Sequence, residues 1–206
     1  MVTLRNFLRL LNCGLLVLAV SFPVALQAQR PLPFSADIAI SSNGQNITGK
    51  MYFALPKTRM DMTSNGRNIS VISDNSTQTS YMIQHQQRMY FEMHGNQPNP
   101  MARNIPKFDS SFDPQNSCVK DGTCKKAGTE TVNGRVCDKW VTTQKDGKTS
   151  TAWLDQRLFV PIKTLNSDGN TMELSNIKEG APPASTFEVP AGYRKMDLGN
   201  MGRPQN

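Results

Sequence analysis

Apolar and polar residues alternate with a period of two along most of this chain. In the segment ITGKMYFAL, Met51 and Phe53 fall on one face, and Tyr52 falls on the other. The segments RMYFEM and TMELSNI alternate in the same way. One-sided alternation of this kind is typical of antiparallel strands with one buried and one solvated face. The chain is therefore predicted to be mainly β.

Tight-turn dipeptides separate the alternating segments and divide them into strands. Asn-Gly and Asp-Gly supply the positive φ angles that short hairpins need. They occur at Asn43-Gly44, Asn65-Gly66, Asn133-Gly134, Asp146-Gly147 and Asp168-Gly169. The predicted strands, which would follow one another as a long meander, are Phe34–Ser41, Ile47–Leu55, Arg59–Thr63, Ile69–Ser73, Thr79–His85, Arg88–Met93, Gly128–Val132, Val136–Gln144, Lys148–Leu154, Pro161–Ser167 and Thr171–Ile177.

Two proline-rich regions interrupt this rhythm. Gly95–Asp113 is expected to hold one short helix or to form a flap, and Pro182–Val189 is expected to hold another helical turn. An antiparallel sheet with one apolar face must cover that face, and long helices are missing from the pattern. We therefore expect a strongly curved antiparallel sheet, a half-barrel with one or two short helices, in a single domain over residues 29–198. Residues 199–206 are predicted to be a disordered tail.

The N-terminus is predicted to be a secretory signal peptide over residues 1–28. Arg5 and Arg9 precede the uncharged apolar run Cys13–Leu26, and a polar, proline-containing segment follows. We place the cleavage near Ala28, which predicts a periplasmic or secreted protein. The alternative is an uncleaved transmembrane anchor, but the run is shorter than the roughly 20 residues that a span needs.

Charge and motifs exclude several classes of function. The 23 basic and 16 acidic residues give a net charge of +7, which falls to +5 without Arg5 and Arg9. No dense basic stripe accompanies this charge, so nucleic-acid binding is not expected. No nucleophile elbow, zinc-protease motif or phosphate loop is present, and His85 and His94 have no third ligand nearby. We predict a protein that is not an enzyme and that needs no metal or cofactor.

The chain is rich in methionine, and most of these residues lie on the alternating apolar face. Met side chains fill irregular cores and also line adaptable binding surfaces. Both interpretations stay open, and the Met-x-Met pair in RMDM adds copper binding as a weaker alternative. The candidate lining of an apolar ligand site is Met51, Phe53, Met60, Met62, Met89, Phe91, Met93, Met172 and Leu174, with Met101, Ile105 and Phe108 as a possible lid.

Three cysteines remain after the predicted signal peptide. Cys118 and Cys124 enclose five residues with an Asp-Gly turn, so a disulfide between them can close. The Asn133-Gly134 turn in TETVNGRVCDKWVTT should place Cys137 opposite Glu130. Cys137 would then be free, or would be the alternative partner of Cys124. A structural role is favoured over a redox role, since no Cys-x-x-Cys motif exists.

Two long segments resemble a known family. The opening PFSADIAISSNGQNITGKMYFALPKTRMDM and the later TAWLDQRLFVPIKTLNSDGNTMELSNIKEG, followed by STFEVPAGYRKMD, resemble periplasmic lipoprotein-carrier (LolA/LolB-like) proteins, in an uncharacterised bacterial branch. The resemblance implies a curved half-barrel whose concave face is covered by helices or filled by an acyl chain. It also implies a functional arginine in the early strands, for which Arg59 is the candidate handover residue.

Together, the pattern and the resemblance predict a non-catalytic module that binds an apolar or amphipathic ligand, with a lipid or a lipoprotein as possible partner. The alternative is a structural or protein-interaction protein of the envelope with a fully packed core. In that case the same methionines would be core residues.

Overall fold

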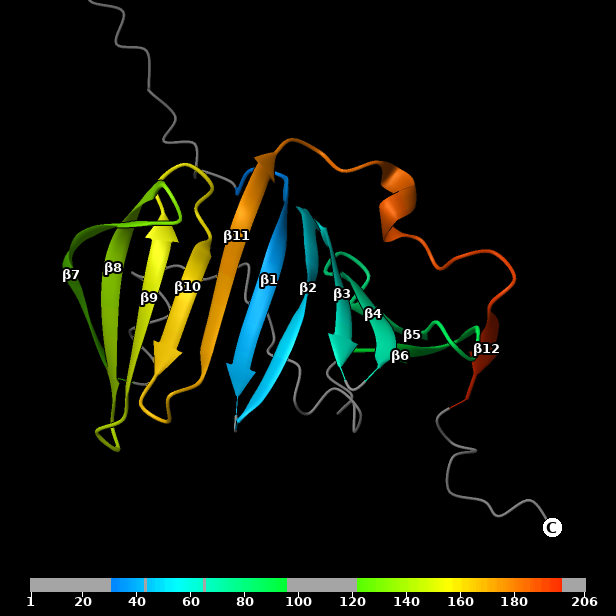
Figure 1. Cartoon of the computed structure of the whole chain (residues 1–206), viewed down its shortest axis with the longest axis horizontal. Helices are drawn as coiled ribbons and strands as arrows, with labels where there is room; N and C mark the ends of the chain where they lie inside the picture. Colours follow the sequence, from blue (N-terminus) through cyan, green and yellow to red (C-terminus); the bar gives the residue numbers. More distant parts are fainter. Residues whose placement is uncertain (1–30, 43, 65, 96–121, 198–206) are drawn as a thin grey trace, which may run out of the picture.

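The computed structural model describes residues 31–42, 44–64, 66–95 and 122–197. These residues form one open, curved sheet of 12 strands, in the order β12-β6-β5-β4-β3-β2-β1-β11-β10-β9-β8-β7 (Figure 1). The one helical element among them is a short 3-10 turn, η1 (Ala184–Phe187). The prediction of a mainly β, strongly curved sheet is confirmed.

The alternation of apolar and polar residues correctly predicted every strand longer than three residues. The strands are β1 (Phe34–Ser42), β2 (Gln45–Ala54), β3 (Lys57–Ser64), β4 (Arg67–Asp74), β5 (Thr79–Gln84), β6 (Met89–His94), β7 (Gly122–Val132), β8 (Arg135–Gln144), β9 (Thr149–Asp155), β10 (Pro161–Asn166), β11 (Thr171–Glu179) and β12 (Arg194–Met196). Only β12, which is three residues long, was not predicted, and β7 begins six residues earlier than expected.

The sheet consists of two antiparallel meanders that meet in its middle. Strands β1 to β6 form one meander and β7 to β11 form the other, and β1 pairs with β11 to join them. The prediction of one continuous meander is therefore wrong between β6 and β7, because the outer edge of β6 pairs with β12 in parallel instead. Apolar cross-strand pairs such as Ile38 with Leu174 stabilise the β1–β11 junction.

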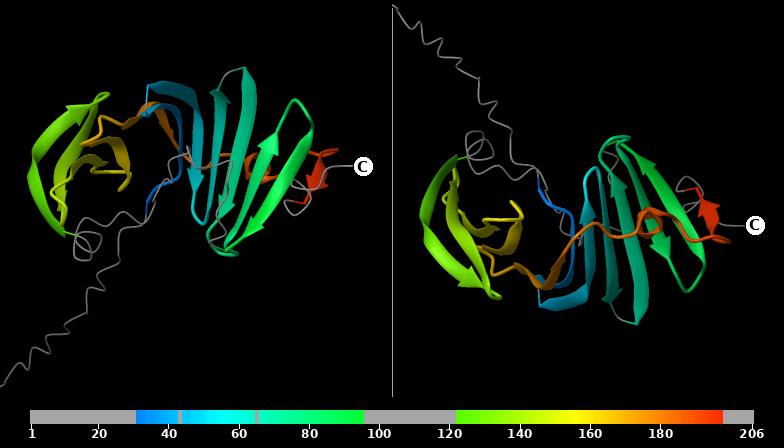
Figure 2. Two further views of the ribbon diagram at one scale, coloured as in Figure 1. Left: turned by 90° about the horizontal axis from the view of Figure 1, so that it is seen from below. Right: turned by 90° about the horizontal axis from the view of Figure 1, so that it is seen from above.

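Close strand approach and β-bulges accompany the curvature that is visible in Figure 2. Gly49 in β2 lies so close to β3 that an added Cβ atom would stand 1.9 Å from the carbonyl oxygen of Asp61. The pairing register also shifts between Ser35 and Asp37 in β1 and between Pro161 and Lys163 in β10. Bulges bend a strand and increase its twist, so the sheet curls instead of remaining flat.

Turn chemistry fixes the β7–β8 hairpin as the sequence predicts. Asn133 and Gly134 both have positive φ angles, of 49° and 76°. Val132 then pairs with Arg135, and Cys137 lies opposite Glu130. The side chain of Asn133 reaches β11, where it donates a hydrogen bond of 2.8 Å to the carbonyl oxygen of Leu174. The hairpin tip is thereby attached to the middle of the sheet.

A buried carboxylate connects the strands of the second meander. Asp155, at the end of β9, is 2% exposed and forms an ion pair with Arg135 of β8. Its Oδ1 also accepts hydrogen bonds of 2.8 Å from the backbone N–H groups of Arg157 and Leu158. Arg135 in turn contacts Glu179 of β11 at 2.8 Å. This network holds β8, β9 and β11 together at one end of the sheet.

Several predictions fall on residues outside the described part of the chain. These are the signal peptide, the helix or flap within Gly95–Asp113, and the tail over residues 199–206. The expected helical turn within Pro182–Val189 is present as η1. Among the residues that the structure describes, no helix is long and apolar enough to cross a membrane.

Candidate functional site

The nine residues predicted to line an apolar site share one face of the sheet, which we call the Met-rich face. Cross-strand neighbours share a face, and the register connects these residues in ladders. One ladder runs from Met51 through Met60 and on to Phe91 of β6. A second runs from Leu174 to Met62 and Met89. The Met-rich face consists of Met51, Phe53, Met60, Met62, Met89, Phe91, Met93, Met172 and Leu174.

Most of the Met-rich face is removed from solvent. Eight of its nine residues are 0–9% exposed, and Met89 is half-buried. Its residues from β2, β3 and β11 belong to the main core cluster, together with Phe34 and Ile38 of β1. Phe91 and Met93 pack with Met82 in a smaller cluster at the end of the sheet. The predicted lid residues Met101, Ile105 and Phe108 lie outside the described residues.

The opposite face of the first meander carries a different layer. After β11, the chain crosses strands β2 to β6 as an extended segment that includes η1 and ends in β12 (Figure 2). We call residues 181–196 the C-terminal strap. Phe187 of the strap is buried against Ile72 and Ile83 of the sheet. Half-buried residues of both layers complete this aromatic cluster: Tyr52, Ala54, Tyr81, Tyr90, Val189 and Tyr193.

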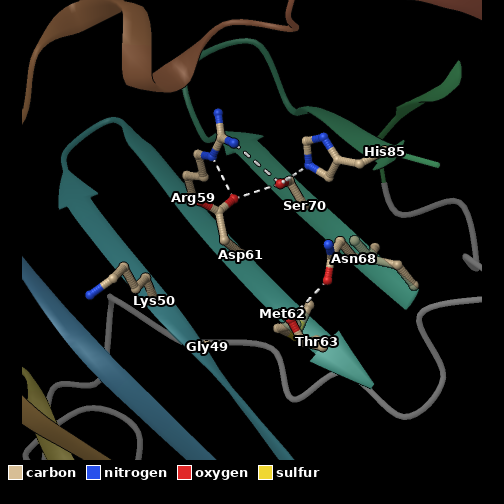
Figure 3. Close-up of a pocket in the computed structure, with 10 residues that line it drawn as sticks. Gly49, Lys50, Arg59, Asp61, Met62, Thr63, Asn68, Ser70 and His85 are labelled. Atoms are coloured by element: carbon tan, nitrogen blue, oxygen red, sulfur yellow. Dashed lines mark hydrogen bonds and ion pairs between the residues drawn. The ribbon is translucent and has the colours of Figure 1, made fainter. Parts of the chain in front are cut away.

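Arg59 lies at the margin of this cluster, where sheet and strap meet (Figure 3). Its Nε donates a hydrogen bond of 2.6 Å to Oδ1 of Asp61, and its Nη2 donates one of 3.2 Å to Oγ of Ser70. Its Nη1 donates a third, of 2.9 Å, to the carbonyl oxygen of Thr186 in the strap. The candidate handover residue is thus engaged in bonds within the protein, and its side chain is only 14% exposed.

A chain of hydrogen bonds continues from Arg59 to the far end of the strap. Oγ of Ser70 donates to Oδ1 of Asp61 at 2.5 Å and lies 2.7 Å from Nε2 of His85. Nδ1 of His85 lies 2.9 Å from the hydroxyl of Tyr193, and the two rings meet edge to face. Because the Ser70 hydroxyl donates to Asp61, Nε2 of His85 is the donor in its bond to Oγ of Ser70. In the matching neutral tautomer, Nδ1 of His85 accepts a hydrogen bond from the Tyr193 hydroxyl.

The same residues line a hollow of about 510 Å³ on this face. Lys50, Thr63 and Asn68 form its more exposed side, and Arg59, Asp61, Ser70 and His85 form the side next to the strap (Figure 3). Ser70 is fully buried, so its hydroxyl is not presented to a substrate in this conformation, although a histidine is adjacent. The prediction that the protein is not an enzyme therefore stays a prediction.

Metal and redox chemistry both require suitably placed donor groups. Among the described residues, no group of three His, Cys, Asp or Glu side chains is placed to hold a metal ion. Cys137 is a free, fully buried thiol rather than a partner of Cys124, and burial raises its pKa to about 11. Cys118 lies outside the described residues, so the Cys118–Cys124 disulfide stays a prediction.

Sequence reasoning missed the second layer and the role of His85. From the sequence, His85 is noted only as a histidine without a third ligand nearby, and it lies in the β5–β6 turn. However, it continues the alternation of Tyr81 and Ile83, so it lies on the face that the strap covers. That alternation could have indicated the face of the sheet on which His85 lies. The contact between Arg59 and Thr186 joins residues 127 positions apart, and no local pattern indicates it.

The sequence matches one known protein family. Residues 35–159, more than half of the sequence, match the family described as Domain of unknown function (DUF4412). The chain belongs to the DUF4412 family. The match covers strands β1 to β9, and thus both the Met-rich strands of the first meander and the β7–β8 hairpin. None of the curated proteins matches the sequence.

Solved structures with the same fold are distant in sequence from this DUF4412 protein. An uncharacterized conserved protein from Thermus thermophilus is 10% identical, with a TM-score of 0.54 over 81% of this chain and 90% of the other. MucB is 17% identical, with a TM-score of 0.57 over 80% of this chain and 59% of its own. MucB in the Pseudomonas aeruginosa MucA/MucB complex is 18% identical, with a TM-score of 0.56 over 79% and 57%.

These similarities establish the fold alone. This chain matches little more than half of MucB's length. Assignment to the lipoprotein-carrier family, as the sequence resemblance suggested, stays a prediction.

Proposed function

We propose that this DUF4412 protein is a periplasmic, non-catalytic binding module that holds an apolar or amphipathic ligand, a lipid or an acylated protein, against the Met-rich face. One observation carries the proposal. Nine apolar residues from β2, β3, β6 and β11 share one face of an open, curved sheet, where the cross-strand register places them in common rows. Within the described residues, the single helical turn covers the other face.

The composition of this face suits a ligand of variable shape. Methionine is unbranched and flexible, and its thioether is polarisable, so a Met-lined surface can repack around different acyl chains or apolar side chains. Met51, Met60 and Met62 lie together on β2 and β3. An acyl chain bound between them would gain roughly 0.8 kcal/mol for each buried methylene group.

A similar structure supports binding as the general function. MucB, which shares the fold, has been solved in complex with MucA. We extend to the DUF4412 protein only the inference that such a curved sheet can serve an association. The lipid or acylated ligand rests on the apolar composition of the Met-rich face.

A second candidate function is a protein-interaction module of the envelope with a packed core. The observation that favours it is the low exposure, 0–9%, of eight of the nine residues. In that case the Met-rich face packs within the protein and partners bind elsewhere. The two candidates differ in whether an acyl chain can enter.

Titration with cis-parinaric acid, a fluorescent fatty acid, distinguishes these two functions. The test variant is Met62→Gln, which places an amide on the Met-rich face, and the matched control is Thr63→Gln on the next residue of β3. The proposal expects saturable binding to the wild-type protein and to Thr63→Gln, and at least a 10-fold weaker affinity for Met62→Gln. Circular dichroism establishes that both variants are folded.

Native mass spectrometry of the protein isolated from its host envelope provides the physiological readout. The proposal expects an additional mass that dissociates as a lipid or a fatty acid. Absence of any bound species, together with no saturable cis-parinaric acid binding to the wild-type protein, would refute it and would favour the packed interaction module.

A further inference from the structure

The C-terminal strap is attached to the sheet by few contacts. Among the described residues, three side-chain bonds hold it: Arg59 to the Thr186 carbonyl oxygen and His85 to the Tyr193 hydroxyl, each at 2.9 Å, and Lys195 to Glu92. One backbone bond of 2.9 Å runs from the N–H of Arg194 to the carbonyl oxygen of Arg88, beside the short β12–β6 pairing. Within the strap, only Phe187 is buried.

These attachments make the strap less stable than the sheet beneath it. All three residues of β12 are exposed, and the Lys195–Glu92 ion pair involves a lysine side chain that is 56% exposed. Exposed ion pairs contribute little to stability. Segments with few buried apolar contacts and exposed backbone hydrogen bonds open locally at a lower free energy than the core.

The hydrogen bond from Arg59 to the Thr186 carbonyl oxygen is the strongest attachment of the strap. Asp61 and Ser70 already fix its guanidinium, so it meets the Thr186 carbonyl oxygen without losing further side-chain freedom. A hydrogen bond from a charged donor is roughly twice as strong as a neutral one. Arg59 is also mostly removed from solvent, which reduces competition from water.

The surface below the strap differs in character from the rest of the sheet. Ile72 and Ile83 are 0–1% exposed while the strap is in place. Tyr81 and Tyr90 lie beside them, with ring centroids 6.1 Å apart. Burial, assisted by the charge of Glu92, raises the pKa of Tyr81. Removal of the strap would expose an apolar and aromatic patch on the face opposite the Met-rich face.

We infer that the strap is a latched cover that opens as a unit while the sheet stays folded, and that Arg59 is the positioning residue that holds it closed. Opening breaks the Arg59–Thr186, His85–Tyr193 and β12–β6 contacts and uncovers the aromatic cluster. The inference goes beyond the proposed function, because it concerns the other face of the same strands and requires no ligand on the Met-rich face.

Hydrogen–deuterium exchange of the full-length protein, read by mass spectrometry, tests the latch. The variant is Arg59→Met, which keeps an apolar side chain and removes the three donated bonds. The matched control is Lys50→Met on β2, which faces the same side and whose ion pair, among the described residues, is with the half-buried Asp37. Loss of one charge-assisted bond should accelerate exchange over residues 184–196 roughly 10- to 100-fold. Lys50→Met should leave strap exchange unchanged.

Peptides from β1 and β11 report whether the sheet itself is affected. The inference expects their exchange in Arg59→Met to stay within about 3-fold of the wild-type rate. Tyr193→Phe, which removes one hydroxyl and keeps the ring, should accelerate strap exchange by a smaller factor. Unchanged strap exchange in Arg59→Met would overturn the inference. Equal acceleration of the strap and of β1 and β11 would also overturn it, because strap and sheet would then open together.

Discussion

Replacement of Asp155 by Asn probes the buried network that holds the second meander together. Oδ1 of Asp155 accepts the N–H groups of Arg157 and Leu158, and Oδ2 pairs with Nε of Arg135. In the Asn variant, the amide oxygen can keep the two backbone bonds. Its NH₂ group then faces Nε–H of Arg135, so two donors meet and the guanidinium loses one of its two charged partners.

The cost follows from the burial of the pair. The side chain of Asp155 is 3% exposed and that of Arg135 is 19% exposed, so water replaces the lost contacts poorly. Breaking a buried ion pair by neutralising one partner destabilises a protein by about 3–5 kcal/mol. Arg135 keeps its contact with Glu179 at 2.8 Å, which places the expected loss at the lower end of that range.

The pH dependence gives a second, independent expectation. Burial alone would raise the pKa of Asp155, but the bonds from Arg135 and from the Leu158 and Arg157 N–H groups outweigh burial and lower it below 3.8. A carboxylate whose pKa is lower in the folded state stabilises the protein fully above its unfolded pKa. That contribution disappears as the pH falls through the folded pKa. The Asn variant should therefore lose less stability than the wild type below about pH 4.

Urea denaturation at pH 7 and at pH 3.5 measures both effects. The control is Asp168→Asn, because Asp168 lies 3.9 Å from Lys148 and both side chains are 57% exposed. A pair of this kind contributes about 0–1 kcal/mol. If Asp155→Asn were no more destabilising than Asp168→Asn at pH 7, the Arg135–Asp155 network would not hold the meander together, and the reasoning would be refuted.

Three further predictions concern packing and reactivity. Gly49→Ala should lower the free energy of unfolding by about 1–3 kcal/mol or more, because its Cβ would meet the Asp61 carbonyl oxygen at 1.9 Å; a neutral effect in urea denaturation would contradict this. Met51→Ala should cost about 2–5 kcal/mol if the Met-rich face is packed core, and clearly less if the face is a ligand site. Cys137, with its pKa raised to about 11, should resist iodoacetamide at pH 8 until urea unfolds the protein; rapid labelling of the native state, read by mass spectrometry, would show the thiol to be accessible.

The strands and their faces could be predicted because their causes are local. Asn133-Gly134 sets its own turn geometry, and alternation alone assigns Met60 and Met62 to one side of β3. The partner of a sheet edge is not local. Alternation describes β1 and β6 equally well, and it cannot indicate that β11 adds to β1 while β12 adds to β6.

The helical turn of the strap could be predicted, but the packing of the strap on the sheet could not, for a related reason. Its sequence alternates over only a few residues, and on the sheet it meets both the Arg59 side chain and the apolar cluster around Ile72 and Ile83. The resemblance to lipoprotein carriers drew attention to Arg59, but as a residue that acts on a ligand. In the structure, its guanidinium instead donates hydrogen bonds to Asp61, to Ser70 and to the Thr186 carbonyl oxygen.

These two roles of Arg59 exclude each other at the Thr186 carbonyl oxygen. A ligand that takes the Nη1 donor of Arg59 must release Thr186, and with it the strongest attachment of the strap. Such a ligand should therefore accelerate exchange over residues 184–196. A ligand confined to the Met-rich face contacts Met60 and Met62, whose side chains point away from the strap, and should leave that exchange unchanged. Strap exchange measured with and without cis-parinaric acid thus tells which face of β3 the ligand uses.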